Sequence, residues 1–377
     1  MRSGGGSVVF FTLGSNSPAG RFRVTQYIPY LEKAGWNCIL WPACPAIEYS
    51  RLDIFNFKYG RYINSLVKTL FSIILTVWRI LQVGRYDVVF LQRRLPNIGG
   101  SIFFELALRK FSRYLIFDFD DAIYMGWTRK NGFYADSRIE NNFSDIVKSS
   151  DYVIAGNKYL ANKTNSPSKT TVIPTAVDTM RFRPIPSDLI MKEEKSLIIG
   201  WTGVEANYPY LYAIETPLQK IFDLFPNATL KVISNKRPNP DFLKGQVKYE
   251  QWQSELEVEQ LQSIDIGIMY LPDNEWTRGK CGFKIIQYMA VGKPVVASPV
   301  GVNLDIVKHG QNGYLAFTMD EWSEYLTRLM SDASHRLKLG QEAIHTVEQQ
   351  FSIHSCLPIL KNILEKAFEA KSEAKIV

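Results

Sequence analysis

Cysteine is scarce in this 377-residue chain, and its placement excludes two kinds of site. The cysteines are scattered and lack the spacing of paired metal ligands. They also do not form the dense framework of a disulfide-stabilised secreted domain. We expect reduced thiols in a cytosolic protein, each a small buried apolar side chain. They are Cys38, Cys44, Cys281 and Cys356.

A long uncharged hydrophobic run is also missing. The most hydrophobic stretch, residues 62–83, contains Lys68 and Arg79, which leave about ten uncharged residues where a spanning helix needs about 20. Two interpretations remain open. One is a buried crossover helix of a parallel sheet; the other is a membrane-surface helix with Trp and Phe toward lipid and Arg61, Lys68 and Arg79 near the head groups. The first apolar segment, Val8–Leu13, is too short for a signal peptide.

Charge is distributed unevenly along the chain. Residues 1–180 hold 22 Lys and Arg against 13 Asp and Glu, a net +9, and residues 181–377 hold 22 against 24, a net −2, which together give +7. The basic half predicts an anionic partner: a phospholipid surface, a lipid pyrophosphate or a nucleic acid. No arginine-rich tail, zinc knuckle or RNA-binding aromatic signature supports a nucleic acid.

Strands alternate with helical patterns in two successive runs, which predicts two parallel, doubly wound sheets. The first run extends from Val8–Leu13 to Thr171–Pro174, and the second begins at Leu197–Trp201 and includes Val295–Ala297. Between them, Phe182–Ser187 contains two prolines and is expected to be the linker. Loops that follow strands in such sheets face one crevice. In the first half these are the predicted loops 14–23, 92–97 and 118–127.

A glycine-rich, cationic loop stands out in the second half. The loop contains Arg278 and Lys280 and precedes a helix expected to begin after Gly282 and to end at Gly292. Lys284 lies in the first turn of that helix. Free N–H groups and the helix dipole at such an N-terminus attract an anion, so the pattern indicates a phosphate-bearing ligand. The alternative is an ordinary helix–strand unit with solvated lysines.

The run MAVGKPVVA, Met289–Ala297, resembles the signature of retaining glycosyltransferases of family 4, which have the GT-B fold. In that signature two Glu residues lie upstream, and their positions fall on Gly279 and Gln287 here. The resemblance implies that Gln287 holds the donor ribose, which an amide can do by hydrogen bonding. It also implies that Lys284 reaches the donor diphosphate. Glycine cannot replace the first carboxylate, and Glu275 lies nearby.

Two further segments are similar to the family: Val172–Pro184 to its inter-domain segment and Gly310–Leu315 to its N-G-x-L turn. The resemblance implies two Rossmann-like domains with a cleft between them. These would be an acceptor-binding domain at 1–180 and a nucleotide-sugar-binding domain at 181–350, with a C-terminal helix in 351–377 that crosses back to the first. No metal and no cofactor is expected, because enzymes of this type neutralise the diphosphate with cations and helix dipoles.

Three carboxylates follow a predicted strand in the first half: Asp118, Asp120 and Asp121. Crowded carboxylates raise one another's pKa, which suits proton transfer. The alternatives are a Mg²⁺ site, or a structural role in which one Asp caps the next helix and another pairs with Arg93 or Arg94. All histidines lie late in the chain. Asp120 or Asp121 is therefore the candidate to orient the acceptor hydroxyl where many family members have a His.

Four arginines are candidates for binding the acceptor, because a guanidinium can clamp a phosphate with two hydrogen bonds. Arg21 and Arg23 follow the predicted loop that begins at Gly14, and Arg93 and Arg94 follow a predicted strand. The alternative is that they are exposed arginines without a ligand.

On the donor side, Gly203 after Thr202 permits close approach of a phosphate or sugar. Trp252 is a candidate to stack on the base, the alternative being a core tryptophan. The donor-binding candidates are Thr202, Gly203, Trp252, Arg278, Lys280, Gly282, Lys284 and Gln287.

The sequence thus supports the hypothesis of a retaining glycosyltransferase that moves a sugar from a nucleotide sugar to a lipid-linked saccharide. The expected setting is bacterial surface polysaccharide synthesis at the inner face of the cytoplasmic membrane. Domain closure about residues 178–187 would exclude water. The alternatives are a sugar-nucleotide epimerase, which would not need a basic acceptor half, and a catalytically silent partner subunit, which Gly279 and Gln287 favour.

Overall fold

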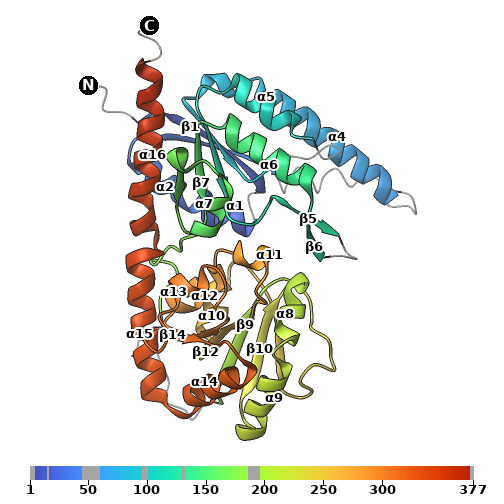
Figure 1. Ribbon diagram of the computed structural model, residues 1–377, viewed down its shortest axis with the longest axis vertical. Coiled ribbons are helices and arrows are strands. Elements are labelled where there is room, and N and C mark those ends of the chain that lie inside the picture. Colours follow the sequence, from blue (N-terminus) through green and yellow to red (C-terminus); the bar gives the residue numbers. More distant parts are fainter. Residues whose placement is uncertain are drawn as a thin grey trace. The chain divides into compact units, whose positions relative to one another are not determined.

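The computed structural model describes residues 5–14, 17–44, 60–95, 101–128, 132–185 and 196–373. The chain forms two compact units: unit 1 comprises Met1–Thr175 with Cys356–Val377, and unit 2 comprises Ala176–Ser355 (Figure 1). The described residues do not include positions 15–16 and 96–97 of the predicted loops, or positions 186–187 of the predicted linker and hinge. The side chain of Arg61 is also outside them.

The sheet of unit 1 has six parallel strands in the order β2-β1-β3-β4-β7-β8. Strands β3 and β4 are buried along their whole length, as their continuous apolar sequences require in a sheet covered on both faces. The strand order reverses between β1 and β3, so ligands are expected outside the carboxyl ends of these two strands. The strands are β1 (Ser7–Gly14), β2 (Asn37–Cys44), β3 (Val88–Gln92), β4 (Leu115–Phe119), β7 (Tyr152–Ala155) and β8 (Thr170–Val172).

Helices cover this sheet, and the last one comes from the far end of the chain. Phe368 of the last helix packs edge-on against Trp36, with ring centroids 6.3 Å apart. A Cβ atom on Gly6 would lie 2.6 Å from the Phe368 ring, so glycine permits this contact. An antiparallel hairpin, β5 (Met125–Thr128) with β6 (Gly132–Ala135), follows β4. The main helices are α1 (Pro18–Arg23), α2 (Ile28–Lys33), α4 (Gly60–Ile80), α5 (Phe103–Phe111), α6 (Ser137–Ser149), α7 (Lys158–Lys163) and α16 (Ile353–Glu373).

Unit 2 contains a second six-stranded parallel sheet, in the order β11-β10-β9-β12-β13-β14. This is the strand order of a Rossmann fold, and it reverses between β9 and β12. The predicted α/β class with two parallel sheets is confirmed. The strands are β9 (Ile198–Thr202), β10 (Thr229–Ser234), β11 (Val247–Gln251), β12 (Ile266–Met269), β13 (Val295–Ala297) and β14 (Gly313–Leu315).

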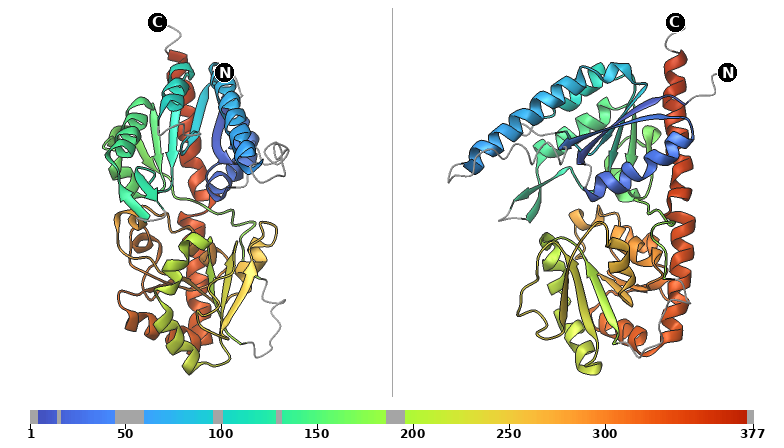
Figure 2. Two further views of the ribbon diagram at one scale, coloured as in Figure 1. Left: turned by 90° about the vertical axis from the view of Figure 1, so that its right-hand side faces the viewer. Right: turned by 180° about the vertical axis from the view of Figure 1, so that it is seen from behind.

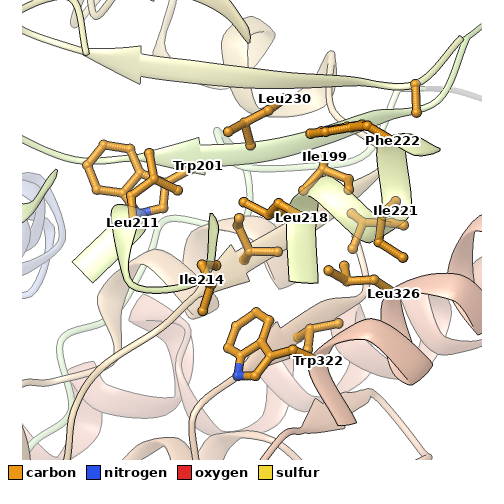
Figure 3. Close-up of a cluster of buried hydrophobic side chains, with 14 of the residues drawn as sticks. Ile199, Trp201, Leu211, Ile214, Leu218, Ile221, Phe222, Leu230, Trp322 and Leu326 are labelled. Carbon is orange, nitrogen blue, oxygen red and sulfur yellow. The ribbon is translucent and has the colours of Figure 1, made fainter. Parts of the chain in front are cut away.

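The core of unit 2 forms where α9 and α14 pack on the sheet (Figure 3). Leu218 and Ile221 of α9 face Ile199 of β9, and Trp322 and Leu326 of α14 complete the cluster. The helices are α8 (Tyr208–Tyr212), α9 (Glu215–Leu224), α10 (Glu257–Gln262), α11 (Glu275–Arg278), α12 (Phe283–Ala290), α13 (Asn303–Ile306), α14 (Met319–Ser331) and α15 (Ala333–Gln350).

Two segments predicted as loops contain short helices. Helix α1 begins after Ser17, whose side chain caps it, and Pro18 occupies its first turn. Helix α11 lies within the predicted loop before α12 and is capped reciprocally by Asn274 and Thr277. Both predictions were wrong for the same reason: a capping residue in the sequence starts a helix that the glycines nearby obscured.

Helix α4 is the crossover between β2 and β3, as one interpretation of residues 62–83 expected, but most of its large apolar side chains are exposed or half-buried. Arg79 is instead buried and donates a hydrogen bond to the Pro42 carbonyl at 2.7 Å. The other interpretation expected Arg79 to lie near lipid head groups, and the burial of Arg79 shows that this expectation was wrong. By length and composition Leu66–Arg85 could cross a membrane, with mean hydropathy 1.6, although contacts with α5 and β2 tie α4 to unit 1.

Replacement of Leu218 by Ala should lower the free energy of unfolding by about 2–5 kcal/mol, because its side chain is 0% exposed and the cavity cannot close fully. Leu224 on the same helix is 64% exposed, so Leu224→Ala should change stability by less than about 0.5 kcal/mol. Urea denaturation of both variants measures the difference. Equal effects would contradict the assignment of this face of α9 to the core.

Candidate active site

Helix α12 is docked at the point where the strand order of unit 2 reverses. The hydroxyl of Tyr288 accepts a hydrogen bond from the Thr202 N–H at 2.7 Å, at the end of β9. A Cβ atom on Gly267 of β12 would lie 2.4 Å from the Tyr288 ring, so glycine lets the ring pack against the strand. These contacts bring the first turn of α12 beside Gly203, where a Cβ atom would lie 2.4 Å from Lys284 Nζ. Three donor-site candidates, Thr202, Gly203 and Lys284, therefore lie together.

Lys284 is a partly buried cation at this place. Its Nζ lies 4.4 Å from the centroid of the Trp201 ring, and among the described residues no carboxylate forms an ion pair with it. Burial, with the nearby Lys280, lowers the pKa of Lys284 to about 7. A bound anion would supply the missing opposite charge and raise that pKa again.

The N-terminus of α12 adds backbone donors to these cations. Gly282 precedes the helix with a φ of 63°, and no side chain caps the first turn. A Cβ atom there would lie 2.4 Å from Ile306 Cδ1, so the position requires glycine. Lys280, whose Nζ lies 5.0 Å from the Trp276 ring centroid, is next to this turn. Uncapped N–H groups and two lysines make this the strongest candidate anion site in the described part of the chain.

Arg278 and Trp252, also predicted for the donor, lie in different surroundings. Arg278 donates two hydrogen bonds to the Asp273 carboxylate, at 2.6 and 2.9 Å, and both side chains are largely exposed. The hydrogen bonds from Arg278 lower the pKa of Asp273. Trp252 follows the edge strand β11, two strands from β9 in the sheet, and is partly buried. The structure does not bring Trp252 to the reversal point, and both roles stay predictions.

Gln287, the candidate for ribose binding, is buried beside a carboxylate that the sequence did not single out. Its amide donates a hydrogen bond to Glu257 Oε1 at 3.2 Å. Glu257 belongs to α10, is buried, and also lies 3.4 Å from a guanidinium nitrogen of Arg181. Helix α10 contains two acidic residues, Glu257 and Glu259, and nothing in the sequence showed which of them turns inward.

In unit 1, Arg93 holds two of the three clustered carboxylates. Its Nε donates to Asp120 at 2.7 Å and an Nη donates to Asp121 at 2.6 Å. Arg93 has a φ of 61°, an uncommon conformation for a residue other than glycine. The pairing of an Asp with Arg93 is therefore confirmed, and the pair lies at the carboxyl ends of the adjacent strands β3 and β4. The expected helix that an Asp would cap is wrong, because the next element along the chain is the strand β5.

The third carboxylate, Asp118, forms a fully buried ion pair with Arg23. Arg23 Nε donates to Asp118 Oδ2 at 3.2 Å, and Arg23 Nη1 donates to the Ile173 carbonyl at 2.6 Å. Arg23 is thus a buried structural cation in α1, and the view that it is an exposed arginine was wrong. Arg94 lies 3.5 Å from the buried Glu105, and the Arg21 guanidinium lies 4.8 Å from the Phe22 ring centroid.

The pKa shifts correct one prediction. Crowding was expected to raise the carboxyl pKa values, but that of Asp120 is lowered, because the pull of Arg93 outweighs the effect of burial. The pKa of Asp118 is raised, and the main cause is burial. Asp120 therefore stays ionised and suits the acceptance of a hydrogen bond better than the uptake of a proton.

Two buried polar side chains at the same edge have no hydrogen-bond partner among the described residues. They are Gln92, with both its amide atoms, and Thr12. The two residues follow the registered pair Phe11 and Leu91 on adjacent strands β1 and β3, where the strand order of unit 1 reverses. Buried polar groups without hydrogen bonds destabilise a fold, so a polar ligand that bonded to Gln92 and Thr12 would be stabilising here.

Comparison with known proteins decides the class of enzyme. Residues 242–346, which include the α12 anion site, match the model of the family described as Glycosyl transferases group 1. This segment is thus similar to glycosyltransferases. The predicted enzyme class is confirmed, and enzymes of this family generally need no cofactor beyond the nucleotide sugar. In the described part of the chain, no group of three or more His, Cys, Asp or Glu residues could hold a metal ion.

Solved structures agree with the fold. HepE of Anabaena is 14% identical, with a TM-score of 0.68 over 96% of this chain and 100% of HepE. Sucrose-phosphate synthase of Thermosynechococcus elongatus is 14% identical, with a TM-score of 0.67 over 97% and 100% of the two chains. A glycosyltransferase of Rickettsia africae is also 14% identical, with a TM-score of 0.66 over 96% and 98%. The GT-B prediction is confirmed. No curated protein matches the sequence.

The Asp118–Arg23 pair should be far more important for stability than the exposed Asp273–Arg278 pair. Asp118→Asn leaves a buried guanidinium without its counter-charge and should lower the free energy of unfolding by about 3–5 kcal/mol. The matched change Asp273→Asn at a solvent-exposed pair should cost less than about 1 kcal/mol. Urea denaturation at neutral pH tests both, and comparable costs would contradict the burial assigned to Asp118.

Proposed function

We propose that the protein is a retaining glycosyltransferase of family 4 that transfers a sugar from a nucleotide diphosphate sugar to a lipid-linked saccharide in bacterial surface polysaccharide synthesis. The anion site at the N-terminus of α12 carries this proposal, because it combines two lysines and uncapped N–H groups at the reversal point of a Rossmann sheet. The site also lies within the segment that matches the family.

UDP is the first nucleotide to consider for the donor. HepE, whose fold this protein shares, has been crystallised with UDP and glucose and with UDP-glucose. In this protein Lys280, Lys284 and the α12 N–H groups would bind the diphosphate. Gln287, positioned by Glu257, would hydrogen-bond the ribose. Neutralising the leaving diphosphate lowers the barrier to breaking the glycosidic bond.

Unit 1 would bind the acceptor. The net positive charge of the first half supports an acceptor that carries phosphate, and Gln92 and Thr12 offer hydrogen bonds that nothing in the described chain satisfies. Asp120 or Asp121, both held by Arg93, would accept a hydrogen bond from the attacking hydroxyl and orient it. In a front-side transfer with retention, the donor phosphate would take the proton.

A panel of UDP-, GDP-, ADP- and dTDP-sugars tests this proposal, scored by thermal shift and by released nucleoside diphosphate. A shift and turnover with one donor class, in the presence of lipid-pyrophosphate saccharides, is the expected result. A shift without turnover would favour a silent partner subunit. Conversion of the nucleotide sugar without release of the diphosphate would favour an epimerase.

The pKa of Lys284 predicts how UDP binding depends on pH. In the free protein Lys284 loses its proton as pH rises through about 7, and a bound diphosphate raises that pKa. Binding should therefore take up a proton, and the affinity for UDP should fall about tenfold between pH 7 and pH 9. Calorimetry in two buffers of different ionisation enthalpy measures the uptake.

Lys284→Met should bind UDP at least about tenfold more weakly at pH 7 and should lose the proton uptake. The matched variant Lys248→Met, at an exposed lysine of β11, should keep both properties. Unchanged proton uptake in Lys284→Met would show that another group titrates.

Gln92 allows a test of the acceptor side that separates binding from folding. Gln92→Leu removes two unsatisfied buried polar atoms and should raise the free energy of unfolding by about 1 kcal/mol. It should also lower transfer to the acceptor by about tenfold while leaving UDP affinity unchanged, because a hydrogen bond to the acceptor is lost. Gln311→Leu, at an exposed position in unit 2, is the control. A stable variant with full transfer would exclude Gln92 from the acceptor site.

A further inference from the structure

Helix α4 has an unusual distribution of side chains for a helix in water, because polar residues are buried and large apolar residues are exposed. Four polar residues are buried on its inner side together with Ile80, whereas the exposed residues, apart from Thr69, are apolar and recur every three or four positions. Ile74 and Trp78, for example, are 67% and 56% exposed. The buried polar residues are Asn64, Ser72, Thr76 and Arg79. The outward stripe, called here the α4 stripe, consists of Leu66, Leu70, Ile74, Val77, Trp78 and Leu81.

The neighbouring helices show that this pattern is specific to one part of unit 1. Helices α4, α5 and α6 lie beside one another on the sheet (Figures 1 and 2). Helix α5, which contacts α4, also exposes Phe103 and Leu106. Helix α6 instead exposes polar side chains such as Arg138, Glu140 and Lys148. Helix α6 thus presents a polar surface to solvent, whereas α4 and α5 present an exposed apolar surface of the kind that marks an interaction site.

Charge indicates what covers the α4 stripe. No Asp or Glu occurs from Gly60 to Tyr86, a segment that contains Lys68 and the exposed Arg85. On α5 the acidic residue Glu105 is buried against Arg94, while Lys110 is exposed. An apolar stripe with aromatic residues and a cationic border matches the interface of a bilayer that contains anionic lipids.

We propose that the α4 stripe lies on the surface of an anionic lipid bilayer, with α4 parallel to the membrane plane. Contacts of α4 with β2 and α5 hold its polar side against unit 1, which leaves the apolar side to enter the head-group region. Trp78 suits that depth because its ring is apolar and its N–H is polar. Arg85 and Lys110 would reach the lipid phosphates along its border.

The same charge pattern disfavours a second copy of this chain as the cover. In a two-fold contact each stripe would meet its own counterpart, and the cationic borders would face one another. With no acidic residue on α4, nothing there would offset that repulsion. A bilayer with anionic lipids offers the opposite charge, so it fits the stripe better.

The inference deepens the proposed function by naming the surface at which a lipid-linked acceptor would be met. Binding to lipid needs neither donor nor acceptor, however. The two ideas can therefore fail separately: a chain that binds vesicles but transfers no sugar keeps the α4 stripe and loses the transferase proposal, and the reverse holds as well.

Flotation of the full chain with vesicles of phosphatidylglycerol and phosphatidylcholine tests the proposal. The wild-type chain should float with mixed vesicles and about tenfold less with phosphatidylcholine alone. Ile74→Ser with Trp78→Ser should reduce flotation at least about tenfold, because two anchors are lost. The matched double variant Leu224→Ser with Phe317→Ser, at exposed apolar positions of unit 2, should float like the wild type.

A second pair of variants isolates charge. Arg85→Glu should lower flotation severalfold at low salt, with a smaller effect in 0.5 M NaCl, whereas Arg138→Glu on α6 should leave it unchanged. Melting temperatures of all variants should stay near that of the wild type, because every changed side chain is exposed. Wild-type chain that does not float, or a stripe variant that floats normally, would overturn the proposal. So would a dimer, seen by light scattering, that the stripe variant abolishes without any lipid binding.

Discussion

The contact between Tyr288 and Gly267 is the constraint on which the candidate donor site depends. Because β12 has no side chain at Gly267, the ring of Tyr288 packs flat on the strand and its hydroxyl reaches the end of β9. This fixes the first turn of α12 at the reversal point of the sheet. The uncapped N–H groups, Lys280 and Lys284 are then already close together before a ligand binds. Such pre-organised anion sites gain affinity because little conformational entropy is lost on binding.

At the carboxyl ends of its strands, unit 1 has ion pairs instead. Two ion pairs of opposite character lie close in sequence: Asp118 with Arg23 is sealed inside, while Asp120 and Asp121 share Arg93 nearer the surface. The buried pair ties α1 to β4, and the outer group holds two carboxylates on one guanidinium at the ends of β3 and β4. The unusual backbone of Arg93 is tolerated because both of its carboxylate partners and the Asp118 carbonyl hold it.

The sequence predicted the strands well because buried parallel strands are mostly apolar runs, and Val295–Ala297 has the predicted bounds. Lys284 and Gly282 were predicted because a glycine directly before a helix is a local pattern that the sequence alone shows. Glu257 and the Arg23–Asp118 pair were not, since each joins residues distant in sequence and depends on which way a helix faces. The sequence also could not decide between the two interpretations of residues 62–83, because periodicity shows that a helix has two faces but not which of them meets the sheet.

Unit 1 is discontinuous in sequence, since Cys356–Val377 joins Met1–Thr175. A ribosome delivers the strands of its sheet first and the whole of unit 2 next, and only then the Phe368 that packs on Trp36. Unit 2 can therefore close its core during synthesis, whereas unit 1 waits with an unfinished face until α16 emerges. Folding order runs from the middle of the chain outward, and a nascent chain is at greatest risk of aggregation between those two events.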